Sequence, residues 1–311
     1  MFSMSINNQK TLNEAVQFFG VGLHNGVNAN LVVRPAQENF GIKFCRVDLE
    51  KENIIDANYQ NVVEPILCTK IKNEKGITVS TVEHLMAALF GEGIDNALIE
   101  IDAPEVPILD GSAIEFVEAI RSVGIKEQKE PRQFIKVLKK IEISEGEKYI
   151  SIEPLENDLM VDFEIIYKNP LIRTRRKEFK LSDGDLTNIY NSRTFCLYED
   201  IDFIKSQGLA KGGSLENAVV VKDNEILNDN GLRNRHEFVY HKILDCLGDL
   251  MLSGKRIFGH IKTSQGGHAL TNKLLVKFFS DKSNWKLEAA DLSKKDSQSN
   301  TSYKKVASAN L

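Results

Sequence analysis

The chain has 311 residues, of which 42% are hydrophobic and 27% charged, a composition typical of a folded globular protein. Its formal net charge of −4 excludes the global basic field that nucleic-acid-binding proteins use. No stretch approaches the length of a membrane span, and the N-terminus lacks the basic and apolar regions of a secretory signal. The length fits two domains better than one hydrophobic core.

The cysteines are scattered along the chain without CxxC spacing; they are Cys45, Cys68, Cys196 and Cys246. This distribution argues against a disulfide framework and against a cysteine-rich zinc site. We therefore expect a protein of the reducing cytoplasm.

Short strands are predicted for most of the first 70 residues. Apolar residues alternate in 29–35 and 41–47, and an apolar run fills 61–68. Residues 81–91 have apolar groups at helical spacing and end in glycines, so a helix is expected there. A strand, a proline-rich turn and a second helix follow at 97–101, 102–111 and 112–120.

The second half repeats this order of elements. Strand-like segments run from about 134 to 167, and a long helix covers about 235–253. A strand, a glycine turn and a second helix then follow at 256–263, 264–267 and 268–279.

The repeated order predicts an α+β protein of two domains with similar topology, residues 1–127 and 133–283, joined at about 127–133. Residues 194–222 lie outside this plan and are predicted to be an insertion in the second domain. The Ser-, Lys- and Asn-rich tail, 292–311, is predicted to be disordered.

Three residues on the predicted helices could bind a metal ion. His241 and Asp245 lie four residues apart and so project from one helix face, although this spacing alone is more typical of a solvated His–Asp pair. His84 occupies the corresponding helix of the first domain, so a site between the domains could take one ligand from the first and two from the second. Three protein ligands with an open fourth position are typical of catalytic zinc.

Glu83 directly precedes His84 and admits two interpretations. Ser80 and Glu83 fit the S-x-x-E pattern of a capping box, in which Glu83 would only satisfy backbone amides. If Glu83 instead faces the metal, it can take a proton from the attacking water as the general base. The spacing alone does not decide between these alternatives.

His268 follows Gly266 and Gly267 and opens the last predicted helix. An imidazole there could stabilise an oxyanion or protonate a leaving amine, or it could be an ordinary residue of the first helical turn. Asp249, one turn beyond Asp245, could orient that imidazole or be a solvated carboxylate.

Eight segments together resemble one family, in this order: GVGLHNG (20–26), LCT (67–69), TVEHLMAAL (81–89), NALIEID (96–102), PILDGSA (107–113), SRTF (192–195), HKILDCLGDL (241–250) and GHAL-NK (267–273). The family is the zinc-dependent UDP-3-O-acyl-N-acetylglucosamine deacetylases of lipid A biosynthesis. The resemblance covers about residues 8–282 and implies two β-α-α-β layered domains with the active site between them.

The resemblance also implies roles for individual residues. It makes His84, His241 and Asp245 the zinc ligands, Glu83 the general base, and positively charged His268 an acid or electrostatic stabiliser.

Three further roles follow from the resemblance. Asp249 would lie beside the imidazole of the acid, and Thr194 would hydrogen-bond the tetrahedral oxyanion. Lys242 would contact the substrate, unless it is an ordinary helix lysine with a solvated end.

The insertion corresponds to the segment that forms the family's apolar passage for the acyl chain of the substrate. Unless they serve only core packing, the positions expected to line it are Phe195, Ile201, Ala210, Gly213, Ser214 and Ala218, with Leu23 nearby.

Some positions depart from the family pattern or have no firm role. Many members carry lysine where this chain has Gln265, so Lys262 is the alternative contact for the diphosphate. Tyr167 falls where the family often has a Phe-containing segment near the uridine, and we expect it near the substrate. His24 lies in a family motif, but its chemistry suggests no role.

The resulting prediction is zinc-dependent hydrolysis of the acetamide of UDP-3-O-(3-hydroxyacyl)-N-acetylglucosamine to the free amine and acetate, an early committed step of lipid A biosynthesis. Iron(II) is an alternative metal, because sites with nitrogen and oxygen ligands do not strongly exclude it. The expected partner is the UDP-acyl-amino-sugar, without nucleic acid or an integral membrane segment, and the expected state is a monomer. The rival hypotheses are a zinc hydrolase acting on another acylated amino sugar and a non-catalytic binding module.

Overall fold

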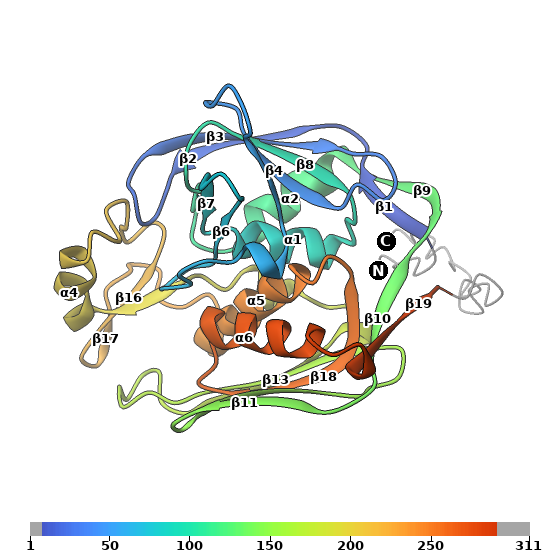
Figure 1. Cartoon of the computed structure of the whole chain (residues 1–311). Helices are drawn as coiled ribbons and strands as arrows, with labels where there is room; N and C mark the ends of the chain where they lie inside the picture. The colour runs from blue at the N-terminus through green and yellow to red at the C-terminus, as the bar shows by residue number, and fades with distance from the viewer. Residues whose placement is uncertain (1–7, 291–311) are drawn as a thin grey trace, which may run out of the picture.

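The computed structural model describes residues 8–290, so the predicted disordered tail at 292–311 lies outside the described residues. Two sheets face each other with helices between them (Figure 1). The α+β class predicted from the sequence is confirmed.

The first sheet has five strands in the order β2-β3-β8-β4-β5. Their bounds are β2 Val16–Val21, β3 Asn28–Pro35, β4 Ile42–Arg46, β5 Ile54–Asp56 and β8 Ala97–Ile101. Alternation explains its buried face, since Ala29, Leu31 and Val33 on β3 are buried and their neighbours are more exposed. That face packs on α1 (Glu83–Glu92) and α2 (Ile114–Val123), as Figure 1 shows.

Two short antiparallel pairs accompany this sheet. β1 (Asn8–Leu12) pairs with β9 (Ile125–Pro131), and β6 (Lys70–Lys72) pairs with β7 (Thr78–Ser80). The segment predicted to join two domains, 127–133, is thus largely the ordered strand β9.

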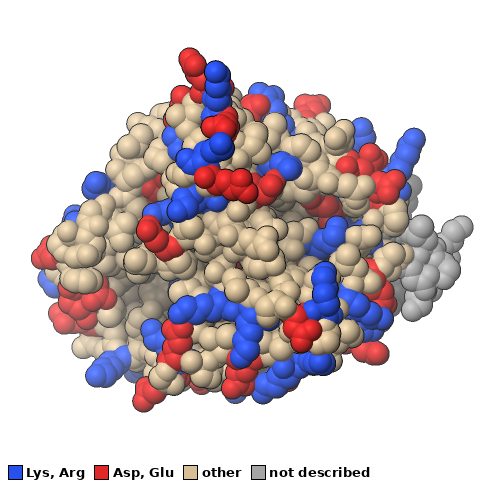
Figure 2. Space-filling model, in the orientation of Figure 1, with Lys and Arg blue, Asp and Glu red and all other residues tan. Residues whose placement is uncertain are grey.

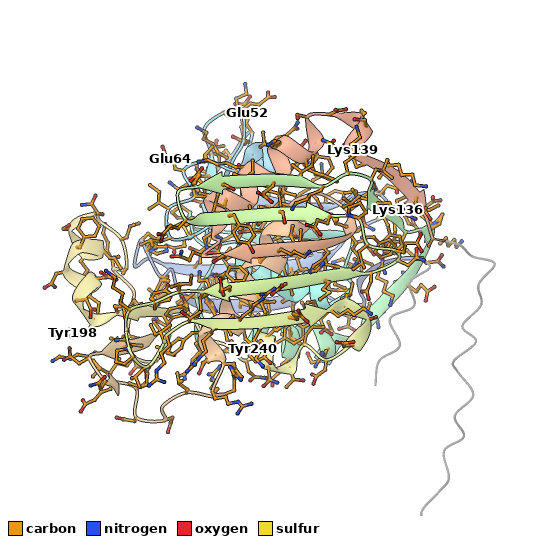
Figure 3. The ribbon with its side chains drawn as sticks, turned by 90° about the horizontal axis from the view of Figure 1, so that it is seen from below. Glu52, Glu64, Lys136, Lys139, Tyr198 and Tyr240 are labelled. Carbon is orange, nitrogen blue, oxygen red and sulfur yellow. The ribbon has the colours of Figure 1, made fainter. Side chains whose placement is uncertain are left out.

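The second sheet has seven strands. Their bounds are β10 Gln133–Val137, β11 Ile141–Glu145, β12 Lys148–Glu153, β13 Leu159–Ile165, β14 Arg175–Lys180, β18 Arg256–Ser264 and β19 Trp285–Ala289. The order β11-β12-β18-β10-β19 is joined by β13, which pairs with β18 and β14. Its inner face packs on α5 (Glu237–Met251) and α6 (His268–Phe279), and Figure 3 views its outer face.

The predicted insertion projects from one side of the molecule (Figure 1). It contains β15 (Phe195–Leu197), α4 (Ile201–Ser206) and β16 (Val219–Lys222), and β15 pairs in parallel with β16. Remaining short elements are α3 Thr187–Tyr190, β17 Glu225–Ile226, and the 3-10 turns Tyr59–Asn61, Leu181–Asp183, Tyr198–Asp200 and Lys282–Asn284.

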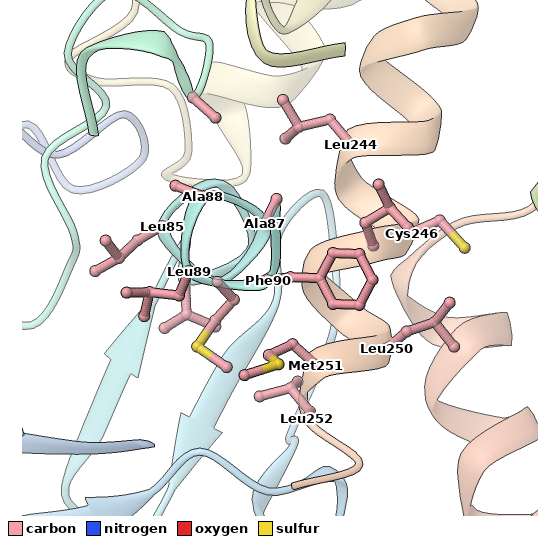
Figure 4. Packing of buried hydrophobic residues seen from close by; sticks show 14 of the residues in the cluster. Leu85, Ala87, Ala88, Leu89, Phe90, Leu244, Cys246, Leu250, Met251 and Leu252 are labelled. Carbon is pink, nitrogen blue, oxygen red and sulfur yellow. The ribbon is translucent and has the colours of Figure 1, made fainter. Parts of the chain in front are cut away.

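Helices α1 and α5 cross closely in the centre of the molecule (Figure 4). Phe90 from α1 and Leu250 and Met251 from α5 are all buried there. Gly248 permits the closest approach, because a Cβ at this position would lie 2.0 Å from the carbonyl oxygen of Glu83. The approach brings the first turn of α1 against the C-terminal half of α5.

The prediction of a strand at 61–68 is wrong. Only Val62 forms an isolated bridge there, and the backbone φ angles of Glu64 and Leu67 are positive, at 44° and 60°. Ile66 is 65% exposed and Leu67 is 53% exposed, so this apolar run does not pack into a sheet. It forms a loop beside the central cavity instead, with Leu67 in the cavity lining.

No helix within residues 8–290 combines the length and apolarity needed to cross a bilayer. Acidic and basic side chains are intermixed over the face shown in Figure 2, without a broad region of one sign.

Candidate active site

Three buried side chains from the crossing helices converge on one point. His84 lies on α1, and His241 and Asp245 lie on α5. One potential ligand atom from each lies within 4.8 Å of the other two. Asp245 Oδ1 is 3.5 Å from His84 Nε2 and 3.3 Å from His241 Nε2. The solvated His–Asp alternative is therefore wrong.

The hydrogen bonds around this cluster leave the inward-facing atoms free. His241 Nδ1 lies 3.0 Å from the carbonyl oxygen of Ser192, and burial lowers the pKa of His241 to about 3. The neutral ring therefore donates Nδ1–H to this carbonyl and keeps a lone pair on Nε2. Asp245 Oδ1 is buried without a hydrogen-bond partner among the described residues, whereas Oδ2 accepts from Lys242 Nζ at 2.7 Å.

This donor set fits a divalent metal ion. An orphaned carboxylate oxygen between two imidazoles is costly to bury unless a cation satisfies it. Burial opposes ionisation, but the charged Lys242 beside it holds the pKa of Asp245 well below its usual range. Two nitrogens and one carboxylate oxygen make a three-ligand set with room for a further ligand.

Glu83 does not cap its own helix. Helix α1 has no side-chain capping bond, and the hydroxyl of Ser80 donates to the carbonyl of Pro104 instead. The carboxylate of Glu83 is buried, and its Oε2 accepts from the backbone N–H of Thr69 at 3.1 Å. The capping-box alternative is therefore wrong. Burial raises the pKa of Glu83, which suits a group that accepts a proton near neutral pH.

His268 opens α6 and lines the same cavity as the His–His–Asp cluster. Its Nδ1 is 2.8 Å from Asp249 Oδ2, and its Nε2 is 3.6 Å from Glu83 Oε1. Burial alone would lower the pKa of His268, but Asp249 and Glu83 raise it to about 9. The imidazolium therefore directs Nε2–H toward Glu83 and the cavity. Asp249 is buried on α5, so its solvated alternative is wrong.

A cavity of about 890 Å³ opens in front of these groups. The His–His–Asp cluster, Glu83 and His268 are among the residues that line it. Apart from Lys262, the residues expected to contact substrate also line it: Leu23, Tyr167, Thr194, Phe195, Ile201, Ala210, Gly213, Ser214, Ala218, Lys242 and Gln265. The cavity is therefore continuous from the polar cluster to the insertion.

Backbone hydrogen bonds hold the insertion against the loop between β2 and β3. The N–H of Gly212 donates to the carbonyl of Leu23 at 3.0 Å, and that of Lys211 donates to His24 at 3.2 Å. A Cβ at Gly212 would lie 2.3 Å from the carbonyl oxygen of Gly22, so only glycine permits this approach. The apolar end of the cavity is thus walled by segments far apart in the sequence.

The two alternative diphosphate contacts lie in different places. Gln265 lines the cavity. Lys262 does not; it lies on β18, and its Nζ donates to Glu153 Oε2 at 2.8 Å. Lys148 supplies a cation to the cavity lining instead, and the sequence interpretation missed it.

Thr69 was also missed as a site residue, although the LCT segment was noted. Its hydroxyl lies 2.5 Å from Asp249 Oδ1 and 3.0 Å from His268 Nδ1. Ser192, which orients His241, lies in the SRTF segment but was given no role. Neither contact has a local sequence signal, because both join residues far apart in the chain.

Comparisons with known proteins agree with this geometry. The family model for LpxC, UDP-3-O-acyl N-acetylglycosamine deacetylase, matches residues 9–280. The chain belongs to this deacetylase family. A UDP-3-O-acyl-N-acetylglucosamine deacetylase from Pasteurella multocida is 41% identical over 286 residues, covering 91% of this chain and 93% of the relative. Proteins of the same name from Shewanella violacea and Tolumonas auensis are 42% and 43% identical, each covering 90% of this chain and 92% of the relative.

Membership of the LpxC family confirms the predicted resemblance and the prediction of an amide hydrolase. Enzymes of this family use a metal ion, and His84, His241 and Asp245 form a group suited to hold one.

Proposed function

We propose that this enzyme hydrolyses the acetamide of UDP-3-O-(3-hydroxyacyl)-N-acetylglucosamine, giving acetate and the free amine on the route to lipid A. The observation that carries the proposal is the position of Glu83 and His268 on one side of a buried His–His–Asp cluster, at the inner end of a cavity that becomes apolar in the insertion. Curated relatives of this name, about two-fifths identical over most of the chain, support the substrate class.

We assign zinc to the cluster of His84, His241 and Asp245, because two neutral imidazoles and one carboxylate suit it. Iron(II) is the second candidate, since the same ligands accept it. When bound, the ion supplies Lewis acidity to the attacking water and to the amide carbonyl.

Glu83 is the proposed general base. Its Oε2 is engaged by the N–H of Thr69, so Oε1 is the atom free to take a proton from the attacking water. The raised pKa of this buried carboxyl favours holding that proton until the amide bond breaks.

His268 is the proposed acid and electrostatic stabiliser. Its Nδ1–H is held by Asp249, which leaves Nε2–H to face the developing negative charge. Thr194, at the cavity wall, would donate its hydroxyl to the same oxyanion. Collapse breaks the carbon–nitrogen bond, and the amine takes its proton from Glu83 or His268 while acetate leaves.

Substrate recognition is assigned to the rest of the cavity. Lys242 and Tyr167 would contact the polar part of the substrate, and Phe195 and Ile201 would line the acyl passage with the other cavity residues of the insertion. We further propose that the enzyme acts as a monomer in the cytoplasm; the four free cysteines are consistent with a reducing compartment.

The test is mass spectrometry of UDP-3-O-(3-hydroxyacyl)-N-acetylglucosamine incubated with the purified enzyme. We expect loss of one acetyl group, abolished by a chelator and restored by zinc. Metal-loaded, folded protein that leaves this substrate intact but deacylates another amino sugar in a panel would contradict the proposal.

A variant separates chemistry from metal binding. Glu83→Gln should lower kcat by about 10²–10⁴-fold, the range of general acid–base catalysis, while metal content stays at the wild-type value. Glu74→Gln, at an exposed position, is the control and should keep full activity. Full activity of Glu83→Gln would exclude its role as base.

A further inference from the structure

Thr69 joins the two proton-transfer groups of the site at the atoms that face away from the substrate. It directly precedes β6 and is buried, with 1% of its surface exposed. Its backbone N–H donates to Glu83 Oε2, and its carbonyl accepts from the N–H of Val82 at 3.3 Å. The segment is therefore fixed against the first turn of α1.

The side-chain hydroxyl of Thr69 contacts His268 and its partner Asp249. With His268 protonated, Nδ1–H donates to Asp249 Oδ2 at 2.8 Å, so the hydroxyl of Thr69 donates to Asp249 Oδ1 at 2.5 Å. The oxygen of this hydroxyl also lies 3.0 Å from His268 Nδ1, as a second acceptor for the same N–H. Both oxygens of Asp249 are thereby occupied, and the carboxylate cannot rotate without losing a hydrogen bond.

We propose that Thr69 is a positioning residue for the deacetylation reaction, whose hydroxyl locks Asp249 in the orientation that aims His268 at the substrate. Its backbone N–H performs the matching task for Glu83. One residue thus sets the relative placement of base and acid, whose facing atoms Oε1 and Nε2 are 3.6 Å apart. This inference rests on the proposed function of the site.

Thr69 does not touch the substrate cavity itself. It lies behind the site, in contact with Asp249 and His268, and is absent from the lining of the main cavity. Its removal should therefore alter turnover and leave substrate affinity unchanged. Charge-assisted hydrogen bonds of this kind are stronger than neutral ones, so a misaligned carboxylate has a measurable effect on the imidazolium.

The experiment compares Thr69→Val, which removes the hydroxyl at nearly constant shape, with Thr69→Ser, which keeps it. With the full-length, metal-loaded enzyme, we expect Thr69→Val to lower kcat about tenfold and to change KM by no more than about twofold. Thr69→Ser should keep most of the wild-type kcat. A decrease of about tenfold is what the misalignment of one catalytic group produces. Metal content should not change. Thr11→Val is the control, because Thr11 is a buried threonine that donates to Asn96 at 2.7 Å far from the site.

A double-mutant cycle distinguishes positioning from general packing. In the Asp249→Asn background, Thr69→Val should have little further effect on kcat, because its partner is already lost. Thermal unfolding of Thr69→Val should resemble that of Thr11→Val, which keeps wild-type kcat.

The outcomes are separable. The role of Thr69 would be overturned if Thr69→Val lowered kcat by the same factor in the wild-type and Asp249→Asn backgrounds, or if Thr69→Ser were as impaired as Thr69→Val. Turnover by the wild-type enzyme would still support the proposed function. Absence of turnover by the wild-type enzyme would overturn the proposed function and this inference with it.

Discussion

Gly248 of α5 lies directly against the backbone of Glu83 at the start of α1, where an added Cβ would come 2.0 Å from the carbonyl oxygen. This contact sets the distance between the helix that carries His84 and the helix that carries His241 and Asp245. Close approach of the two backbones is therefore a condition for assembling the cluster.

Gly248→Ala should both destabilise the protein and weaken metal binding. The added methyl group meets backbone, which cannot move aside as a side chain can, so we expect a loss of about 1–3 kcal/mol in the free energy of unfolding. Urea unfolding and metal analysis measure the two effects. Gly267→Ala is the stability control, because its added Cβ meets no atom within 4 Å. Wild-type stability and metal content in Gly248→Ala would contradict the packing argument.

His241→Ala should abolish metal binding, because it removes one of the three proposed ligands. Chelation should lower the thermal unfolding midpoint of the wild type and leave that of His241→Ala unchanged. The shift in the wild type should be large, because a ligand present at 1,000 times its Kd stabilises the folded state by about 4 kcal/mol. His236→Ala, at the start of α5 and outside the cavity lining, should keep its metal. Stoichiometric metal in His241→Ala would show that the ion binds elsewhere.

Asp249→Asn should lower the pKa of His268 from about 9 toward its unfolded value near 6.5. Because folding raises this pKa, the stabilisation is fully present below about pH 6.5 and is lost as pH rises through about 9. The variant should lose that dependence. Among the titratable groups near the imidazole are Asp249, Glu83, Asp245 and His24, and only the first is changed.

Two measurements check this prediction. One is an NMR titration of the His268 ring. The other is the free energy of unfolding between about pH 6.5 and 9.5, a window that spans the unfolded and folded pKa values of His268. Asp185→Asn, at an exposed carboxylate, is the control and should match the wild type. An unchanged His268 titration in Asp249→Asn would refute the assigned ion pair.

Ala218→Phe should shorten the apolar passage. Ala218 is 9% exposed and lines the cavity just before β16, so a phenyl ring at this position would occupy the cavity and not extend into bulk solvent. We expect kcat/KM for a long 3-hydroxyacyl substrate to fall about tenfold or more, and that for a 3-hydroxybutyryl substrate to change by less than about twofold. Equal losses for both substrates would place the acyl chain elsewhere.

The sequence predicted those features that depend on periodicity or spacing within one short segment. The last helix was predicted at 268–279 and runs from His268 to Phe279. His241 and Asp245 could be paired because four residues make one helical turn. His84 could be joined to them only through the parallel order of elements in the two halves and the resemblance to the family.

Other features depend on contacts that no local pattern encodes. Thr69 meets Asp249 across 180 residues and His268 across 199. The capping pattern of Ser80 and Glu83 was present, but tertiary hydrogen bonds engage both side chains. The apolar run at 61–68 satisfied the strand pattern, yet it serves as a cavity wall, where apolar residues are useful without a neighbouring strand.

The proposed ligands are divided between α1 and α5, and this has a consequence for the two halves of the chain as separate molecules. A polypeptide cut between β9 and β10 would leave His84 on one fragment and His241 with Asp245 on the other. Neither fragment could complete the cluster alone, so bound metal would be a direct readout of reassociation. Deacetylation would then depend on fragment concentration as a bimolecular equilibrium, and the intact chain serves as the tether that keeps the effective concentration high.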